Sequence, residues 1–229
     1  MKNLYAKSLT MKTNFPFLLL TAMLMCTASA SLQAQWRLGV SAGVNLADTD
    51  YSAPEGSGIA PENFDTGFTP YFAGGLTLLY RLNDRWAVGS GFQYSPKGYK
   101  VKDFNGSEGV KWRYHYLDVL PQVAFQPISG LELILGANIG NSVREEFKAP
   151  DHEWTDATDV KIIQNLDVGL LAGVRGEYRQ FFLQFSYLHG LTDNTDIRFT
   201  DGNGDPIGEG KQFNRTLQLM LGYWLDFGK

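Results

Sequence analysis

Hydrophobic and polar side chains alternate along much of the chain, and residues 166–178 (LDVGLLAGVRGEY) show the pattern clearly. Every second position there is apolar or aromatic apart from Gly176: Leu166, Val168, Leu170, Ala172, Val174 and Tyr178. The positions between them include Asp167, Arg175 and Glu177. A period of two residues is typical of a β-strand with two unlike faces. We therefore expect a strand with one apolar face and one polar face.

Seven further segments show the same alternation: 36–47, 71–82, 85–95, 116–125, 131–142, 181–191 and 216–227. Three of the connections between strands are short, at 83–85, 126–130 and 179–180. Four are long and polar, at 48–67, 96–112, 143–163 and 192–213. Short connections join antiparallel neighbours. Their strict alternation with long ones places all short turns at one end of the sheet and all long loops at the other.

The apolar faces are too extensive for contact with water, and a lipid bilayer tolerates no free sheet edge. The pattern therefore predicts an all-β fold, an eight-stranded antiparallel up-and-down transmembrane β-barrel with short periplasmic turns and long external loops. The apolar rows would face lipid and the polar rows the lumen. Because buried charges persist only when they are paired, we expect an inward charge network of Arg37, Arg81, Asp118, Glu132, Asp167, Arg175, Glu177 and Asp226.

The interior of an eight-stranded barrel is only wide enough for its own side chains, so we expect no open pore. Aromatic residues near the strand ends predict a girdle at each bilayer interface. The periplasmic girdle would contain Trp36, Trp86, Phe125, Tyr178, Phe182, Tyr223 and Phe227. The external girdle would contain Tyr71, Phe72, Tyr94, Trp112, Tyr114 and Tyr187.

The N-terminal residues predict secretion. Three lysines precede an apolar run over 15–30 that ends in the small residues Ala28-Ser29-Ala30. The run is shorter than the ~20 residues that a membrane-spanning helix needs, so we predict a signal peptide over 1–34. Cleavage is expected after Ala30 or Ala34, which leaves 35–229 as a single outer-membrane β-barrel domain. Cys26, the one cysteine of the chain, lies in the signal after Met25, where a lipid-attachment site needs a small residue.

Loss of the signal peptide makes the chain more acidic. The three lysines removed leave 17 basic residues against 24 acidic ones, a net charge of −7. Nucleic-acid binding demands basic patches, so we expect no nucleic-acid partner. The expected partners are the lipid of the outer membrane and the machinery that inserts barrels, and we expect a monomer.

Candidate chemistry is sparse. The three histidines His115, His152 and His189 have no metal-ligand spacing, and no GxSxG motif occurs. An enzyme at the external rim could use Ser95, His115, His189, Asp193 and Asp196. Any acidic barrel with long loops offers such a choice, and geometry must come before roles. We therefore expect no catalytic residue and no cofactor.

The segment DGNGDPIGEG (201–210) partly matches a calcium-binding loop. Asp201, Asn203 and Asp205 have the spacing of ligands one, three and five, and Glu209 falls at position nine. Pro206 replaces the glycine of position six, and Gln212 replaces the glutamate of position twelve. Asp-Gly, Asn-Gly and Asp-Pro also form turns without any metal. The segment is a candidate calcium loop, and we otherwise expect no metal site.

Several stretches resemble the PorT-like family of outer-membrane β-barrel domain proteins, in order along the chain: WRLGVSAGVNLA (36–47), YLDVLPQVAF (116–125), LDVGLLAGVRGEY (166–178), YLHGLTD (187–193) and NRTLQLMLGYWLDF (214–227). The resemblance covers essentially all of 36–229. It implies an eight-stranded barrel in the outer membrane of a Gram-negative envelope. Barrel chains usually end on an aromatic residue that aids recognition by the insertion machinery, whereas Gly228 and Lys229 follow Phe227 here.

Two classes of function remain open at this point. The first is a membrane barrel without catalytic activity, whose external loops bind a partner or a surface, or which supports the envelope. The second is a component of a secretion or transport assembly, as the PorT-like resemblance implies, with an envelope or secretion protein as its partner. An enzyme at the external rim is a third and weaker alternative.

Overall fold

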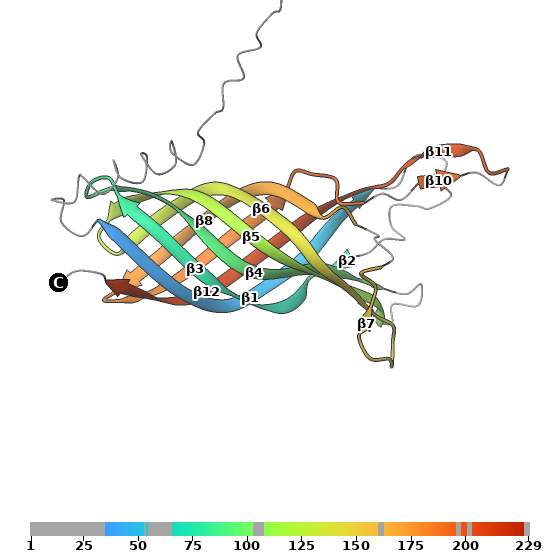
Figure 1. Ribbon diagram of the computed structural model, residues 1–229, viewed down its shortest axis with the longest axis horizontal. Coiled ribbons are helices and arrows are strands. Elements are labelled where there is room, and N and C mark those ends of the chain that lie inside the picture. Colours follow the sequence, from blue (N-terminus) through green and yellow to red (C-terminus); the bar gives the residue numbers. More distant parts are fainter. Residues whose placement is uncertain are drawn as a thin grey trace, which may run out of the picture. The chain divides into compact units, whose positions relative to one another are not determined.

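The structure, a computed structural model, describes residues 35–52, 54, 66–102, 108–159, 163–195, 198–200 and 203–226. The predicted signal peptide over 1–34 lies outside these residues. Eight long strands of the described chain form a closed antiparallel ring (Figure 1). They are β1 (Trp36–Ser52), β3 (Thr69–Arg81), β4 (Trp86–Lys102), β5 (Glu108–Ile128), β6 (Leu131–Lys148), β8 (Leu166–Tyr178), β9 (Phe181–Gly190) and β12 (Lys211–Asp226). The eight-stranded up-and-down barrel predicted from the sequence is confirmed.

Each barrel strand pairs with its neighbour along the chain, and β1 pairs with β12 to close the ring. The short turns after β3, β5 and β8 lie at the same end of the barrel, as predicted (Figure 1). Two of these turns contain a residue with a positive φ, Gly130 (78°) and Arg179 (56°). Tight hairpin turns match the twist of their strands through such residues.

The outer wall of the barrel is apolar, as the alternation predicted. Outward side chains at mid-strand are largely exposed, for example Leu170 (55%), Leu135 (67%) and Leu221 (60%). The residues between them are buried in the lumen, and Leu171, next to Leu170, is 2% exposed. An exposed apolar wall of this extent matches the hydrocarbon region of a membrane.

The strands β4, β5 and β6 are longer than predicted. They continue to Lys102, from Glu108 and to Lys148, so most of the expected loop at 96–112 and the first part of the expected loop at 143–163 are strand. We use the term external extension for the parts of these strands beyond the apolar wall, which are residues 95–102, 108–116 and 140–148. The short strand β7 (Thr155–Asp156) pairs with the β6 part of this extension. The short strands β2 (Thr66–Gly67), β10 (Arg198–Thr200) and β11 (Pro206–Glu209) were also not predicted.

The external extension was not predicted as strand from the sequence, and the reason is physical. Both of its faces carry polar residues, so the alternation ends although the hydrogen-bonded ladder continues. A bulge in β6 also shifts the register, because His115 pairs with Arg144 whereas Tyr116 pairs with Ser142. Val143 is the extra residue, and beyond it the even-numbered positions of β6 face outward.

Glycines allow close strand packing at particular lumen positions. A Cβ at Gly43 would collide with the backbone carbonyl of Leu219, and one at Gly89 with the carbonyl of Leu78. Both glycines face the lumen on β1 and β4. Any larger residue there would push apart two neighbouring strands. Among the described residues, no helix has the length and apolar character needed to cross a membrane.

The girdle prediction was partly wrong. Trp36, Trp86, Tyr178, Tyr223, Phe72, Tyr94 and Tyr187 are outward and exposed, as expected. Tyr71, Tyr114 and Phe182 are instead buried in the interior, with exposed fractions of 7%, 0% and 2%. Trp112 stacks on Tyr114 with ring centroids 6.3 Å apart. These four aromatics occupy positions of the inward row, and Phe227 lies outside the described residues.

Candidate functional site

A group of buried charges closes the periplasmic half of the lumen. Arg175 of β8 donates from Nη1 to Glu132 of β6 at 2.8 Å, and both side chains are almost fully buried. Arg81 reaches the other oxygen of Glu132 at 3.2 Å. Arg175 also donates from Nε and Nη2 to the amide oxygen of Gln184. The carboxylate and the guanidinium groups therefore satisfy one another inside the barrel.

Trp224 joins this periplasmic group from β12. Its indole N–H donates to Glu177 at 2.9 Å, and Glu177 also accepts from Arg37 at 3.0 Å. The Arg37 guanidinium lies 4.3 Å from the centroid of the Trp224 ring, and Phe182 packs against the same ring. Trp224 is fully buried. The sequence signal for it was its place in the inward row of 216–227.

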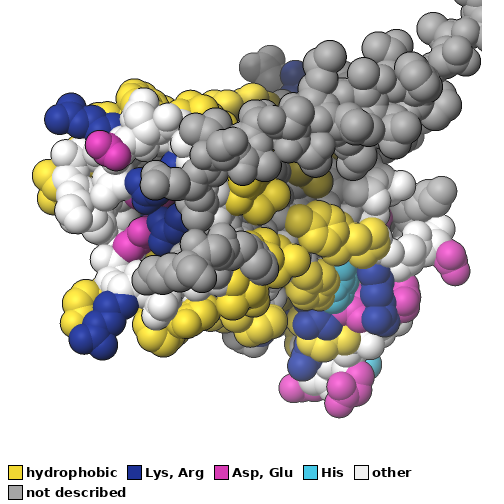
Figure 2. Space-filling view, turned by 60° about the vertical axis from the view of Figure 1, so that its left-hand side comes forward, with side chains coloured by type: hydrophobic (Ala, Val, Ile, Leu, Met, Phe, Trp, Pro, Cys, Tyr) yellow, Lys and Arg dark blue, Asp and Glu magenta, His cyan; other side chains and the backbone are white. Residues whose placement is uncertain are grey.

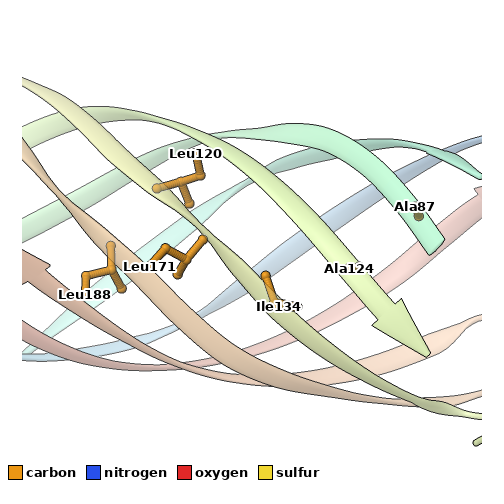
Figure 3. Packing of buried hydrophobic residues seen from close by; sticks show 6 residues of the cluster. All are labelled: Ala87, Leu120, Ala124, Ile134, Leu171 and Leu188. Carbon is orange, nitrogen blue, oxygen red and sulfur yellow. The ribbon is translucent and has the colours of Figure 1, made fainter. Parts of the chain in front are cut away.

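An apolar layer lies next to these charges along the lumen. Figure 3 shows side chains of this layer, with Leu120, Leu171 and Leu188 lying close together. Ile134, Ala87 and Ala124 belong to the same buried cluster. The layer consists of inward residues on neighbouring strands, so it fills the space between their faces. Aliphatic side chains in a closed lumen exclude water and ions.

A second charged group lies in the external half of the lumen. Lys97 of β4 is 2.7 Å from an oxygen of Asp167 and 3.2 Å from one of Asp118, and all three side chains are buried. Its ammonium also lies 4.5 Å from the centroid of the Tyr116 ring. Asn194 donates to the second oxygen of Asp167 at 3.3 Å. Lys97 was not among the predicted inward charges, because it fell in a predicted loop.

The predicted inward charges thus lie in two groups. The periplasmic group contains Arg37, Arg81, Glu132, Arg175 and Glu177, and the external group pairs Asp118 and Asp167 with Lys97. Asp226 is the Cα partner of Arg37 in the β1–β12 ladder. A cavity of about 10 Å³ lies in the lumen beside Gln93, Gln122 and Met220. A cavity of this volume is at the lower limit for holding one water molecule.

Another set of charges lies on the outward face of the external extension. Glu146 accepts hydrogen bonds from Arg113 Nε at 2.7 Å and from His115 Nε2 at 2.9 Å. Arg144 bridges Glu146 at 3.0 Å and Asp156 of β7 at 3.1 Å. We call these five residues the external charge cluster. Figure 2 shows Lys, Arg, Asp and Glu side chains beside a histidine next to hydrophobic surface.

Two carboxyl groups of the external charge cluster have lowered pKa values. Burial alone would raise the pKa of Glu146, but hydrogen bonds from His115 and Arg113 outweigh it and hold this pKa below its usual value. Hydrogen bonds from the hydroxyl and the backbone N–H of Thr158 lower the pKa of the exposed Asp156, and Arg144 adds to this effect. Both groups are therefore anions at neutral pH.

The residues considered for a rim enzyme do not come together. Ser95 faces the lumen and accepts from Asn45 at 3.0 Å, whereas His115 lies on the outward face. His189 is on β9 and contacts Tyr187 at 3.2 Å. Asp193 accepts backbone N–H groups, including that of Gln212 at 2.9 Å. Asp196 lies outside the described residues. No nucleophile–base pair forms among the four that the structure describes.

The candidate calcium loop is divided between a turn and a strand. Asp201 lies outside the described residues, Asn203 and Asp205 are in the β10–β11 turn, and Glu209 is in β11 opposite Arg198. Glu209 lies four residue steps after Asp205, roughly 13 Å along an extended strand. The structure therefore does not bring Glu209 to the turn. The described residues hold no group of three or more His, Cys, Asp or Glu side chains arranged for a metal ion.

A closed ring of eight strands, apolar outside and filled by side chains inside, defines a small outer-membrane β-barrel. The comparison with protein families agrees, because residues 28–196 match the family described as outer membrane protein beta-barrel domain. The chain belongs to this family and is an outer-membrane protein. This description does not name the PorT-like group, and membership of that group remains a prediction.

Solved structures of small barrels are similar to this chain. Neisserial surface protein A is 15% identical with a TM-score of 0.48, and the match covers 81% of this chain and 96% of that one. Ail, the attachment invasion locus protein of Yersinia pestis, is 14% identical with a TM-score of 0.44 over 83% and 99%. Outer membrane protein W of E. coli is 14% identical with a TM-score of 0.39 over 85% and 100%. No curated protein sequence matches the chain significantly.

Proposed function

We propose that this protein is a non-enzymatic outer-membrane barrel that acts through its external surface. The main observation that supports this proposal is the contrast between the interior of the barrel and its external end. Side chains fill the lumen with two charged groups and an apolar layer, whereas β4, β5 and β6 extend beyond the lipid-facing wall and expose charged side chains. The barrel anchors the extension, and the extension meets the exterior.

The closed lumen argues against conduction. The lumen cavity beside Gln93, Gln122 and Met220 measures about 10 Å³, which is at the lower limit for one water molecule and far too small for a file of hydrated ions. We expect the purified protein to give no steady, well-defined conductance step in planar lipid bilayers. A large and stable step would mean that the lumen opens, and it would contradict a role confined to the surface.

A shortened hairpin tests the role of the extension directly. Lys97 and Tyr114 are paired in the β4–β5 ladder, so residues 98–113 can be replaced by Asn-Gly, a favoured two-residue hairpin turn. The variant should still insert into the outer membrane as a folded barrel. On a denaturing gel, its unheated and boiled samples should therefore still migrate differently. It should fail to restore resistance to detergent and bile salts in a strain that lacks the protein. Full complementation would contradict an external surface function.

The second class, a component of a secretion or transport assembly, is supported by the PorT-like resemblance alone. The same strains distinguish it. A secretion component would show a loss of exported proteins from the culture medium in the deletion strain. The shortened hairpin would restore export if the partner binds the barrel wall or the periplasmic turns.

A further inference from the structure

The apolar wall has a gap near its periplasmic end. Gly176 of β8 stands in the outward row between Val174 and Tyr178, and a Cβ built on it would meet no atom within 4 Å. Its direct cross-strand partners are Leu131 of β6 and Leu183 of β9. Every other outward position of β8 carries a side chain. No neighbouring atom needs the space at Gly176, so the missing side chain leaves an opening toward the lipid.

A hollow of about 340 Å³ lies at this gap. Besides Gly176, its walls include Tyr178, Phe181, Leu183 and Leu221, which belong to β8, β9 and β12. These four side chains are outward and 52% to 72% exposed. Apolar groups around an unfilled volume favour an apolar occupant over water. We call this hollow the periplasmic notch.

The periplasmic notch lies where the hydrocarbon region meets the headgroups. Tyr178 and Phe181 are cross-strand partners at the ends of β8 and β9, and outward aromatic residues mark the membrane interface. Gly176 is two residues further into the barrel, about 7 Å along the strand. With a strand tilt of about 40°, it lies roughly 5 Å nearer to the membrane centre. An alkyl chain in the notch would therefore be in the hydrocarbon region, with its polar end at the β8–β9 turn.

The β8–β9 turn carries a cation at this level. The turn consists of Arg179 and Gln180, and Arg179 has a φ of 56°. Glycine, asparagine and aspartate are the usual residues with a positive φ in a two-residue hairpin turn, so an arginine there is strained. Its guanidinium lies 5.3 Å from the centroid of the Tyr178 ring. The positive charge is therefore placed beside a wall of the periplasmic notch.

The charge of Arg179 is exposed and has no counter-ion among the residues that the structure describes. Glu177 borders the periplasmic notch, but its carboxylate is directed into the lumen. Both of its oxygens accept from Arg37, and one of them also accepts from Trp224. Glu177 is thus already neutralised by a lumen partner, and Arg179 remains available to an anion outside the barrel.

We propose that the periplasmic notch holds one acyl chain of a phospholipid of the periplasmic leaflet, with the lipid phosphate at Arg179. The chain would cover the apolar walls, and the guanidinium would donate charge-assisted hydrogen bonds to the phosphate oxygens. A lipid is favoured over a protein partner because the notch is continuous with the lipid-facing wall, and β8 is paired on both sides. The site lies at the end opposite the external extension, so this inference does not depend on the proposed external-surface function.

The test uses the protein purified from outer membranes in a nonionic maltoside detergent and freed of bound lipid. Dioleoyl phosphatidylglycerol is the probe, and dioleoylglycerol, which has the same chains without the phosphate, is the comparison. Native mass spectrometry of a lipid titration gives the stoichiometry and the dissociation constant. Wild type should bind a single phosphatidylglycerol tightly, and it should bind dioleoylglycerol about tenfold more weakly.

Gly176→Leu fills the periplasmic notch with a side chain that is common in the outward rows. The barrel should stay folded, because no atom lies within 4 Å of a Cβ at this position. The variant should bind both lipids about tenfold more weakly than wild type, since the chain loses its apolar contacts. Ala172→Leu is the matched control. It adds the same side chain to the same row outside the notch, and its affinity should be unchanged.

Arg179→Asn removes the charge and keeps a residue that tolerates a positive φ, so the turn should form. The variant should bind phosphatidylglycerol about tenfold more weakly and dioleoylglycerol as wild type does. Arg85→Gln is the control, because it removes a positive charge from the β3–β4 turn at the same end of the barrel. Its affinity for both lipids should be unchanged.

Three results would overturn the inference. The first is equal binding of phosphatidylglycerol by wild type and Gly176→Leu, and the second is an equal loss of affinity in the control variants. The third is ready formation of disulfide-linked dimers by Gly176→Cys in membranes, which would assign the periplasmic notch to a second copy of the chain. The cysteine variant is informative because Cys26 lies in the predicted signal peptide.

Discussion

The periplasmic charged group of the lumen and the external charge cluster use the same chemistry in different surroundings. Both join arginines to carboxylates at about 3 Å, as in Arg175–Glu132 at 2.8 Å and Arg144–Asp156 at 3.1 Å. The first pair is 0% and 2% exposed, and the second is 52% and 54% exposed. Burial therefore separates a pair that the fold depends on from a pair that meets the exterior.

The difference follows from desolvation. A buried charge that loses its partner has neither water nor a counter-ion, so removal of one partner is strongly destabilising. An exposed pair exchanges its partner for water at little cost. A ligand could reach the buried charges of the lumen only by breaking existing pairs, whereas the exposed pairs can exchange their contacts for those of another molecule.

The largest expected effect is in the lumen. Arg175→Leu should lower the free energy of unfolding by about 3–5 kcal/mol, because Glu132 would lose a fully buried partner. Urea-induced unfolding in lipid vesicles, followed by tryptophan fluorescence, measures this. Arg144→Leu is the control and should cost at most about 1 kcal/mol, since its partners are exposed or have other donors. Equal losses in the two variants would remove the distinction between the regions.

The next effect concerns the lipid-facing wall. Leu170→Arg places a charge near mid-strand and should cost about 2–4 kcal/mol, whereas Leu166→Arg at the external end of β8 should cost about 0–1 kcal/mol. The same unfolding measurement applies. Single cysteines over 166–178, in a chain whose Cys26 lies in the predicted signal peptide, should react with a lipid-soluble thiol probe at 168, 170, 172 and 174. Stronger labelling at 169, 171 and 173 would reverse the assignment of faces.

The smallest effect is the pH dependence of the external charge cluster. The pKa of Glu146 is lowered in the folded state, so its stabilisation is present above its unfolded pKa of about 4.3 and is lost as pH falls through the folded value. Hydrogen exchange of 140–156 should therefore rise between neutral pH and pH 3, after correction for the intrinsic rate. Glu146→Gln should raise exchange slightly at pH 7 and flatten this rise. An unchanged pH profile in the variant would show that Glu146 does not hold the cluster together.

The barrel was predictable from the sequence because lipid imposes one simple rule on every membrane-spanning strand. Adjacent residues such as Leu170 and Leu171 are both apolar, yet the charges at Asp167 and Arg175 fix which row faces inward. Beyond the lipid this rule ends. Lys97 and Lys100 belong to β4, but polar residues on both faces conceal the strand.

The contacts between inward side chains were less predictable from the sequence than the face on which each side chain lies. The periodicity places Glu132 and Arg175 in the lumen, but their 2.8 Å contact depends on the stagger of β6 against β8, which no local pattern encodes. Trp224 and Phe182 were available in the inward rows. Aromatic residues near strand ends are so often at interfaces that composition favoured the girdle for Phe182.

The bulge at Val143 divides β6 into two segments in which opposite sets of positions, odd or even, face outward. Below it, odd positions face the lipid, and above it, even positions such as Glu146 and Lys148 face outward. Deletion of this one residue would make Ser142 and Arg144 consecutive, still opposite Tyr116 and His115, so the bulge would disappear and the faces of both segments would be kept. The bulge therefore allows β6 to absorb one inserted or deleted residue at this point, while the inward and outward faces of the transmembrane part and of the external extension stay unchanged.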